Sequence, residues 1–345
     1  MLSTNCWGTT RRTAFYGDLA SFMKIAVTGG AGYIGSVCVE LLCEEGHEVV
    51  VIDNLSEGHR AAVDPRARLE VADLAETARV TEILKGHGAE AVIHYAANAL
   101  VGESMSDPGK YFRNNVAGGV SLLEAMVAAE VGKIVFSSTC ATYGEPERVP
   151  IVEDTPQAPV NPYGESKLMF EKVLRWYEEI HGISVVIFRY FNAAGASKRF
   201  GEDHRIETHL IPNALFVPLG RREELQIFGA DHDTPDGTPI RDYIHVSDLA
   251  EIHRLAVERE VDGAFNLGVG TGYSVREVIE ACREVTGHEI PAREVERREG
   301  DPPILVAGND KVVETFGWRP RFDDLRGIVQ DAWNWHQANP EGYGD

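Results

Sequence analysis

The stretch VTGGAGYIGS at residues 27–36 decides which fold this chain is expected to adopt. A short run rich in β-branched residues comes before it, and an apolar pattern typical of a helix follows it. Gly30, Gly32 and Gly35 have the G-x-G-x-x-G spacing, and Gly29 starts a second series at steps of three residues. Glycines at such a turn let the backbone approach a pyrophosphate, and the N-terminus of the helix supplies free N–H groups. The stretch therefore predicts a dinucleotide site in the first crossover of a parallel sheet.

Apolar runs of strand length recur through the first 195 residues, with a helix-length segment between most of them. Continuous apolar runs are typical of strands that a parallel sheet buries on both faces. This alternation predicts an α/β fold with a doubly wound parallel sheet of the Rossmann type. After KIAVT at 24–28, the expected strands are EVVVID (48–53), ARLEVAD (67–73), AVIHYAA (91–97), KIVFSST (133–139) and ISVVIFRYF (183–191).

The composition narrows the class of partner. The 54 acidic and 33 basic residues give a formal net charge of −21, which argues against nucleic acid or an anionic membrane as the main partner. No apolar run has the length of a membrane span. Five cysteines without a CxxC pair are typical of a reduced cytosolic protein. The acidic stretch DHDTPDG (231–237) lacks the closing Glu of a calcium loop, so we expect a turn there and no metal site.

Asp53 stands at the end of the second expected strand, eighteen residues after Gly35. A carboxylate at this position accepts hydrogen bonds from the adenosine ribose and repels a 2′-phosphate, which favours NAD over NADP as the cofactor. Asp73 follows the third expected strand, where either a contact on the adenine side or a helix cap would suit it.

The heptapeptide NPYGESK (161–167) places Tyr163 one helical turn before Lys167. The pair could be a solvated helix start with Pro162 in its first turn. Alternatively, the ammonium lowers the pKa of the phenol, which then acts as a base near neutral pH. Thr139 ends the fifth expected strand and could offer its hydroxyl to the same substrate oxygen.

Read together, these features resemble the short-chain dehydrogenase/reductase superfamily and, more narrowly, the UDP-glucose 4-epimerase family. Several of the motifs lie outside the dinucleotide fold, and they cover nearly the whole chain from Met23 to Asp345. They are, in order, TGGAGYIGS, DNLS, VIHYAA, LVGES, NNVAG, FSST, NPYGESK, RYFNAAGA, HLIP, IFG, RDYIHVSDLA, FNLG, RREGDP and PEGYGD.

The resemblance implies an isomerase that interconverts UDP-glucose and UDP-galactose. Tyr163 would take the proton of the sugar 4-OH while the C4 hydride passes to NAD. The 4-keto sugar would then rotate and receive the hydride on its other face. Lys167 would bind the nicotinamide ribose and lower the pKa of Tyr163, and Thr139 would orient the substrate. The resemblance also implies a cytoplasmic homodimer, formed through long helices expected at 107–130 and 162–181.

By motif position, the resemblance assigns further contacts on both ligands. Arg suits the diphosphate because its planar donors pair with phosphate oxygens. The expected cofactor contacts are Gly29, Gly32, Tyr33, Ile34, Gly35, Asp53, Asn54, Asp73, Leu74, Tyr95, Ala96, Ala97, Asn115, Ser137, Tyr163, Lys167 and Tyr190. The expected UDP-sugar contacts are Thr139, Tyr163, Asn192, Leu210, Phe228, Arg241, Arg298 and Asp301.

Four positions depart from the family pattern. Ala99 stands where some members place a Lys on the cofactor, and Cys140 where Ala is usual. Thr139 stands where some members have Ser, a change that keeps the hydroxyl. Leu305 stands at a position whose size controls the sugar pocket: a Tyr is associated with excluding N-acetyl sugars and a small residue with accepting them. Leu is intermediate in size, so the position leaves the sugar open.

The same motifs leave other functions open, and two of these are disfavoured by particular residues. Epimerases of UDP-N-acetylglucosamine, UDP-xylose or UDP-glucuronate fit the same motifs. A 4,6-dehydratase is disfavoured because Cys140 and Ala141 stand where it needs an Asp-Glu pair. A non-catalytic NAD-sensing protein is disfavoured because Tyr163 and Lys167 are both present.

The pattern of strands and helices changes after about residue 195, and the next fifty residues are rich in charge, Gly and Pro. We therefore predict three parts. Residues 1–22 form a disordered leader, and residues 23–195 form an NAD-binding domain that also carries the catalytic pair. Residues 196–345 form mostly a UDP-sugar lobe, with some segments that return to the sheet.

Overall fold

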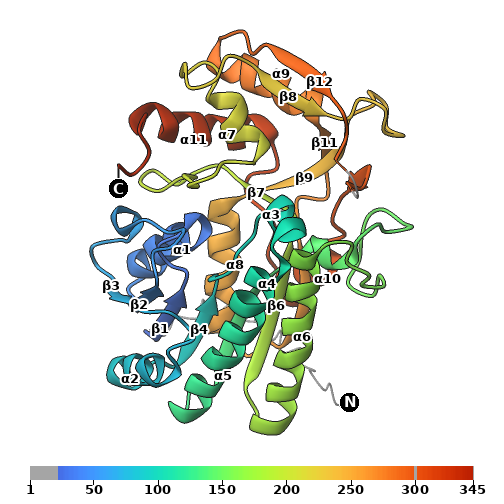
Figure 1. Cartoon of the computed structure of the whole chain (residues 1–345). Coiled ribbons are helices and arrows are strands. Elements are labelled where there is room, and N and C mark those ends of the chain that lie inside the picture. The colour runs from blue at the N-terminus through green and yellow to red at the C-terminus, as the bar shows by residue number, and fades with distance from the viewer. Residues whose placement is uncertain (1–21, 299–300, 345) are drawn as a thin grey trace, which may run out of the picture.

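The computed structural model describes residues 22–298 and 301–344, and its larger lobe is built on a seven-stranded sheet (Figure 1). All neighbouring strands pair in parallel, in the order β10-β6-β5-β4-β1-β2-β3, which confirms the predicted fold class. The leader expected at 1–22 lies outside the described residues except for the exposed Phe22. The strands are β1 (Lys24–Thr28), β2 (Glu48–Asp53), β3 (Arg68–Val71), β4 (Ala91–His94), β5 (Lys133–Thr139), β6 (Ser184–Tyr190) and β10 (Gly263–Leu267).

The sheet register aligns the carboxyl ends of the central strands. Thr28 of β1 pairs with Ile52 on one side and with His94 on the other. Thr139 of β5 pairs with Tyr190 of β6. Strand order runs outward in both directions from β1 and β4, so the crevice between them is the switch point at which such sheets bind ligands.

Helices cover both faces of this sheet, and each face has its own hydrophobic core. Val39, Leu249 and Phe316 belong to one core, and Leu84 and Phe170 belong to the other. Residues far along the chain therefore complete the first core. One face carries α1 (Tyr33–Glu44), α8 (Val246–Glu258) and α10 (Asp310–Phe316), and the other carries α2 (Thr77–His87), α5 (Gly119–Ala128) and α6 (Pro162–His181).

The smaller lobe lies above the carboxyl edge of the large sheet in Figure 1. Its core includes Ile211, Val278 and Ile328, one from each of its helices. The elements are a sheet of β7 (Asn192–Ala194), β9 (Ile240–His245), β11 (Gly272–Ser274) and β13 (Ile304–Leu305), a pair of β8 (Leu225–Phe228) and β12 (Ala292–Val295), and helices α7 (Leu210–Leu215), α9 (Val275–Thr286) and α11 (Leu325–Ala338).

The helix expected at 107–130 differs from the prediction. It starts as α4 (Pro108–Tyr111), continues as a π-helical segment at Phe112–Gly118 and ends as α5. Shorter helices are α3 (Val101–Ser106) and 3-10 turns at Arg60–Ala62 and Cys140–Tyr143. π-Helical turns are frequent at functional sites, and this one contains Asn115.

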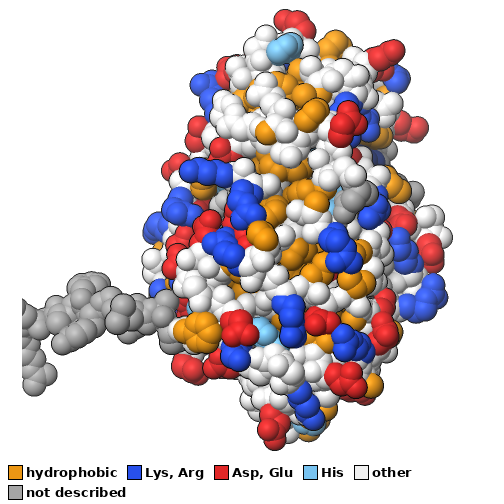
Figure 2. Space-filling model, turned by 90° about the vertical axis from the view of Figure 1, so that its left-hand side faces the viewer, with side chains coloured by type: hydrophobic (Ala, Val, Ile, Leu, Met, Phe, Trp, Pro, Cys, Tyr) orange, Lys and Arg blue, Asp and Glu red, His pale blue; other side chains and the backbone are white. Residues whose placement is uncertain are grey.

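The surface carries its charge without strong segregation on the face drawn in Figure 2, where Lys and Arg side chains are interspersed with acidic ones. Within the described ranges, no helix combines the length and apolar character needed to cross a bilayer.

Candidate active site

The turn between β1 and α1 is shaped by close backbone packing. Gly29 has a φ of 72°, and a Cβ there would lie 2.5 Å from the Ala96 nitrogen. A Cβ on Gly35 would lie 2.2 Å from the Gly29 carbonyl oxygen, so both positions require glycine. Helix α1 starts at Tyr33, and its N-cap Gly32 supplies no side-chain hydrogen bond. The first-turn N–H groups are thus left for a ligand, and the turn fits the pyrophosphate of a dinucleotide.

Asp53 is buried and held by two backbone amides. Its Oδ2 accepts from the Ala31 nitrogen at 3.0 Å and its Oδ1 from the Leu55 nitrogen at 2.8 Å. Burial raises the pKa of Asp53, while these two hydrogen bonds oppose the rise. The carboxylate is therefore fixed at the end of β2 in the place expected for a ribose contact.

Asp73 is engaged with neighbouring residues rather than with a helix start. Its Oδ1 accepts from the Ala75 nitrogen at 2.9 Å, and its Oδ2 accepts from Asn54 Nδ2 at 2.8 Å. The N-cap of α2 is Glu76. The alternative role of Asp73 as the helix cap is therefore wrong, and its bond to Asn54 joins two of the expected cofactor contacts.

The remaining expected cofactor residues surround the same edge of the sheet. Tyr33 donates from its hydroxyl to the Gly195 carbonyl at 2.6 Å, which ties the turn to the chain beyond β7. Tyr95 packs its ring 4.9 Å from that of His253. Ile34, Tyr95 and Tyr190 pack against the core that contains α1, and Leu74 packs against the other core, while Ala96 and Ala97 follow Tyr95 in the loop after β4.

Asn115 ties the loop after β4 to α6, and Ser137 ties β5 to α8. Asn115 accepts from the Asn98 nitrogen at 2.9 Å, and its amide donates to the Asn98 carbonyl and to Ser166 Oγ. Ser137 Oγ bonds His253 Nε2 at 3.0 Å. Within the protein, both polar side chains therefore hold neighbouring elements together, whether or not they also contact the cofactor.

The start of α6 brings Tyr163 to the end of β5. Asn161 caps the helix by accepting from the Gly164 nitrogen at 2.8 Å. A Cβ on Gly164 would lie 2.5 Å from the Ala141 carbonyl oxygen, so only glycine lets the helix start approach the turn after β5 this closely. The Thr139 side chain lies close enough to the Tyr163 hydroxyl to lower the pKa of the phenol. Two of the three expected catalytic groups are thus neighbours.

Lys167 is buried behind this pair. Its Nζ donates to the Ser137 carbonyl at 2.8 Å and lies 4.8 Å from the centroid of the Phe136 ring. Burial lowers the pKa of Lys167 to about 7, although the charge of Glu171 opposes the shift. The ammonium of Lys167 is therefore held on β5, close to the carboxyl edge of the large sheet.

The prediction that Lys167 lowers the pKa of Tyr163 is wrong for the protein on its own. Burial raises the pKa of Tyr163 to about 12, and the Thr139 side chain only partly offsets the rise. The physical reason is that Lys167 directs its Nζ to a backbone carbonyl and is itself desolvated. A phenolate at neutral pH requires a further positive charge beside the ring.

Apart from Thr139 and Tyr163, the expected UDP-sugar contacts lie in the smaller lobe, and two of them form an ion pair. Arg241 of β9 pairs with Asp301 and also donates to the Pro302 carbonyl at 2.7 Å. Leu305 of β13 is the register partner of Arg241. Leu305 also packs against the cluster that contains Cys140, so this part of the lobe meets the turn that follows Thr139.

A second pair of expected contacts lies on the β8 side of the lobe. The Arg298 guanidinium stacks 4.1 Å from the centroid of the Phe228 ring. Asn192 is in β7, where it pairs with Tyr243 of β9, and Leu210 is the first residue of α7. All of the contacts expected only for the UDP-sugar therefore belong to the smaller lobe, although two of them already engage each other as an ion pair.

A buried ion pair beneath the catalytic groups was not anticipated. Glu171 and Arg189 pair at 2.7 Å with both side chains almost fully buried, and Ser138 donates to Glu171 at 2.5 Å. Arg189 also donates to the Tyr143 hydroxyl at 2.9 Å. The spacing offered a signal, because Glu171 follows Lys167 by one turn on the buried face of α6. Its partner on β6 had no signal in the sequence.

Comparison with known proteins agrees with this geometry. The family model described as "NAD dependent epimerase/dehydratase family" matches residues 25–268. A UDP-glucose 4-epimerase of Lacticaseibacillus casei is 50% identical over 94% of this chain and 99% of its own length. A crystal structure of a UDP-glucose 4-epimerase superposes with a TM-score of 0.90 at 50% identity, over 92% of this chain and 99% of that one.

A further solved structure carries ligands. The UDP-glucose 4-epimerase of Bifidobacterium longum, in complex with NAD⁺ and UDP, matches with a TM-score of 0.88 at 36% identity, over 92% of this chain and 99% of its own. This chain has the same fold as that structure, and its glycine turn, its buried Asp53 and the neighbouring Tyr163 and Thr139 lie on this fold. The chain therefore belongs to the NAD dependent epimerase/dehydratase family and, within it, to the UDP-glucose 4-epimerase family.

Proposed function

We infer that this protein interconverts UDP-glucose and UDP-galactose by transient oxidation at C4 of the sugar, with NAD as a bound cofactor. The observation that carries the inference is that Tyr163 and Thr139 are neighbours at the same sheet edge as the glycine turn. Bound NAD supplies the acceptor and donor for the C4 hydrogen, and its positive charge when oxidised favours the phenolate of Tyr163. Asp53 and the N-terminus of α1 would hold it.

Side chains of the protein itself carry out the remaining steps of the reaction. Tyr163 takes the proton of the sugar 4-OH and returns it, acting as the general base and then as the general acid. Thr139 orients the substrate beside the phenol. Lys167 stands one turn behind Tyr163 with its ammonium on the Ser137 carbonyl, and in this proposal it binds the nicotinamide ribose.

The UDP part is assigned to the smaller lobe. Arg241 and Arg298 are the cations suited to the diphosphate, and Asn192 and Leu210 lie on elements of the same lobe. Phe228 and Asp301 act through the two arginines that they contact. A firm hold on the nucleotide leaves the sugar free to present either face to the cofactor.

The test is an assay of the purified protein with four UDP sugars side by side: UDP-galactose, UDP-N-acetylgalactosamine, UDP-xylose and UDP-glucuronate. Interconversion of UDP-galactose and UDP-glucose without net NADH production is expected. Absence of turnover of UDP-galactose, with turnover of another of the four, would overturn the choice of sugar and leave the C4 chemistry in place. Because Leu305 is intermediate in size, the N-acetyl sugar is the informative comparison.

We also propose that the protein is a homodimer in the cytoplasm. Support comes from an apolar stripe on the outer face of α6, where Met169, Trp176 and Ile180 are exposed, Trp176 by 61% and Ile180 by 68%. Val127 is exposed on α5, which lies beside α6 on the same face of the sheet in Figure 1. Trp176→Glu should convert a dimer to a monomer in sedimentation, whereas an unchanged mass would contradict this interface.

A further inference from the structure

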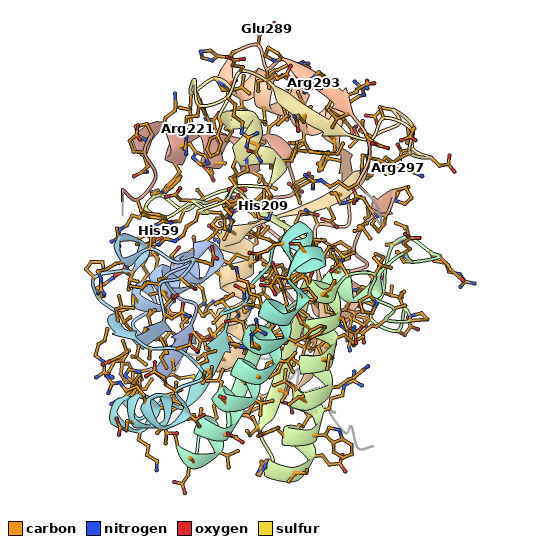
Figure 3. The ribbon with its side chains drawn as sticks, viewed as in Figure 1. His59, His209, Arg221, Glu289, Arg293 and Arg297 are labelled. Carbon is orange, nitrogen blue, oxygen red and sulfur yellow. The ribbon has the colours of Figure 1, made fainter. Side chains whose placement is uncertain are left out.

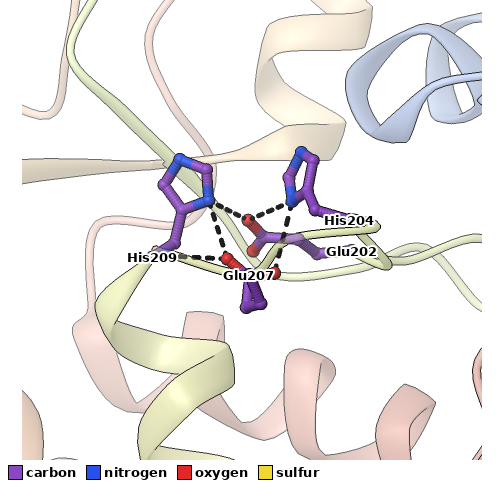
Figure 4. A group of neighbouring side chains, drawn as sticks. All are labelled: Glu202, His204, Glu207 and His209. Atoms are coloured by element: carbon purple, nitrogen blue, oxygen red, sulfur yellow. Dashed lines mark hydrogen bonds and ion pairs between the residues drawn. The ribbon is translucent and has the colours of Figure 1, made fainter. Parts of the chain in front are cut away.

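The segment between β7 and α7 gathers four side chains that play no part in the proposed reaction. Glu202, His204, Glu207 and His209 each direct one possible ligand atom to a common point, and these atoms all lie within 4.8 Å of one another (Figure 4). The junction between the two lobes contains His209, as Figure 3 shows.

The close contacts in this cluster outnumber the hydrogens that could make them as hydrogen bonds. His204 Nδ1 lies 3.3 Å from Glu202 and 3.2 Å from Glu207, and His209 Nδ1 lies 2.8 Å and 3.0 Å from the same two carboxylates. Each Nδ1 carries at most one hydrogen, so two hydrogens would have to serve four contacts. Ligand bonds of about 2.0–2.2 Å to tetrahedral zinc place neighbouring ligand atoms about 3.3–3.6 Å apart. The short His–Glu contacts would therefore open slightly, and the wider pairs, which lie within 4.8 Å of each other, would close.

The two carboxylates of the cluster need positive charge beside them, which either a metal ion or the protonated histidines can supply. The side chains of Glu202 and Glu207 are each only 6% exposed. Within residues 22–298 and 301–344, the cations paired with these two carboxylates are His204 and His209. Two buried carboxylates this close repel each other unless positive charge lies between them.

We propose that Glu202, His204, Glu207 and His209 bind one divalent ion of the zinc class as a structural site. Two imidazoles and two carboxylates suit zinc and its first-row neighbours, whereas magnesium and calcium prefer oxygen ligands alone. All four positions of a tetrahedron are supplied by the protein, which is typical of structural rather than catalytic zinc.

The surroundings supply the support that a metal site needs. The His209 backbone nitrogen donates to Glu207 Oε1 at 2.7 Å, and Asn213 donates to the His209 carbonyl at 2.8 Å. The His204 ring meets the Tyr33 ring edge-on at 6.1 Å. The ion would therefore fix the start of α7 against the first residue of α1, and so one lobe against the other.

Protons compete with a metal ion for the two histidines of the cluster. Burial lowers the pKa of His204 and of His209, but the two carboxylates outweigh it and raise them to about 9 and about 10. Without metal, the cluster is a network of ion pairs. A metal can enter because the His204 and His209 side chains are 29% and 43% exposed, and a polar surface depression lined by His59, Asp203 and Arg221 reaches His204.

The experiment uses the full chain, stripped with a chelator and titrated separately with Zn²⁺ and Co²⁺. We expect one ion bound per chain by elemental analysis, the intense visible bands of tetrahedral Co²⁺, and a higher midpoint of thermal unfolding with Zn²⁺. Glu202→Gln and His204→Ala should each abolish stoichiometric binding. His288→Ala, which changes an exposed histidine elsewhere, should bind as the wild type does.

Three outcomes would overturn the site. They are wild-type protein that takes up no Co²⁺, Co²⁺ bound with an octahedral spectrum, and metal content unchanged in both cluster variants. If a variant failed to fold, the stoichiometry and Co²⁺ spectrum of the wild type would still decide. The readout is independent of epimerase activity, so failure of the proposed function would not affect it.

Discussion

The cofactor edge of the large sheet and the smaller lobe prepare their polar side chains in different ways. At the cofactor edge, the backbone holds them: Asp53 accepts from two amides, and Lys167 donates to a carbonyl. In the smaller lobe, Arg241 also donates to the Pro302 carbonyl, but its charge is paired with the side chain of another expected contact, Asp301. Backbone partners are fixed by the fold, whereas a side-chain partner can be exchanged.

This difference indicates how each ligand is bound. A dinucleotide meets groups that are already in place and need little rearrangement, which favours a cofactor that stays bound. A diphosphate that pairs with Arg241 must share its guanidinium with Asp301 or replace it. At the proposed substrate site, binding would therefore carry a cost that cofactor binding does not, and release of the product would be correspondingly easier.

The largest expected effect lies at the cofactor edge. Tyr163→Phe removes the hydroxyl that transfers the proton, and kcat for UDP-galactose should fall about 10²–10⁴-fold. NAD content, measured by absorbance after denaturation, should stay at the wild-type level. Tyr177→Phe, farther along α6, is the matched control and should leave kcat unchanged. A Phe variant at position 163 with the wild-type rate would rule out this base.

The second variant, Lys167→Met, should lower kcat about 10²-fold and also change stability. Burial lowers the pKa of Lys167 from 10.5 to about 7, so between these pH values the unfolded chain binds one more proton than the folded chain. The free energy of unfolding therefore rises with pH across this window, by at most about 1.4 kcal/mol per pH unit from this group.

In Lys167→Met this contribution disappears, so the free energy of unfolding should rise less steeply between pH 7 and 10. Urea unfolding at several pH values measures the slope. Lys172→Met, at an exposed position of the same helix, should keep the wild-type slope. If the slopes at the two positions were equal, the buried cation would not be the source.

A third test separates the two roles of Asp53. Asp53→Ala removes acceptors for the backbone and for the ribose, and the NAD dissociation constant should rise about 10–100-fold. Asp53→Asn keeps one acceptor but removes the charge, so NADP binding should improve with a smaller loss of NAD affinity. Fluorescence titration with both dinucleotides measures this. An unchanged ratio of the two affinities would argue against the ribose contact.

The smallest effect is expected in the lobe, where the partner can be exchanged. Arg241→Gln should raise KM for UDP-galactose about 10-fold with little change in NAD affinity. Asp301→Asn should lower KM if the aspartate competes with the diphosphate. Arg293→Gln, at an exposed arginine of the same lobe, is the control. Equal effects on KM and on NAD affinity would remove the contrast between the two regions.

Local patterns were sufficient for much of the fold. The helix expected at 162–181 is α6 with the same bounds, and the six expected strands are β1 to β6. They could be predicted because parallel strands are buried on both faces and so appear as uninterrupted apolar runs. The π-helical interruption around Asn115 had no such signal, since it depends on contacts with Asn98 and Ser166.

The amino-acid sequence alone was enough to predict the glycine turn and the placement of Tyr163 and Lys167 on one helix, because each depends on spacing over a few residues. It also predicted the doubly wound sheet, because strands and helices alternate along the first 195 residues. Only the tertiary structure decided the direction of the Tyr163 pKa, the partner of Arg241 sixty residues away and the convergence of Glu202 and Glu207 on two histidines. Burial and long-range contacts set these properties, and neither can be read from local spacing.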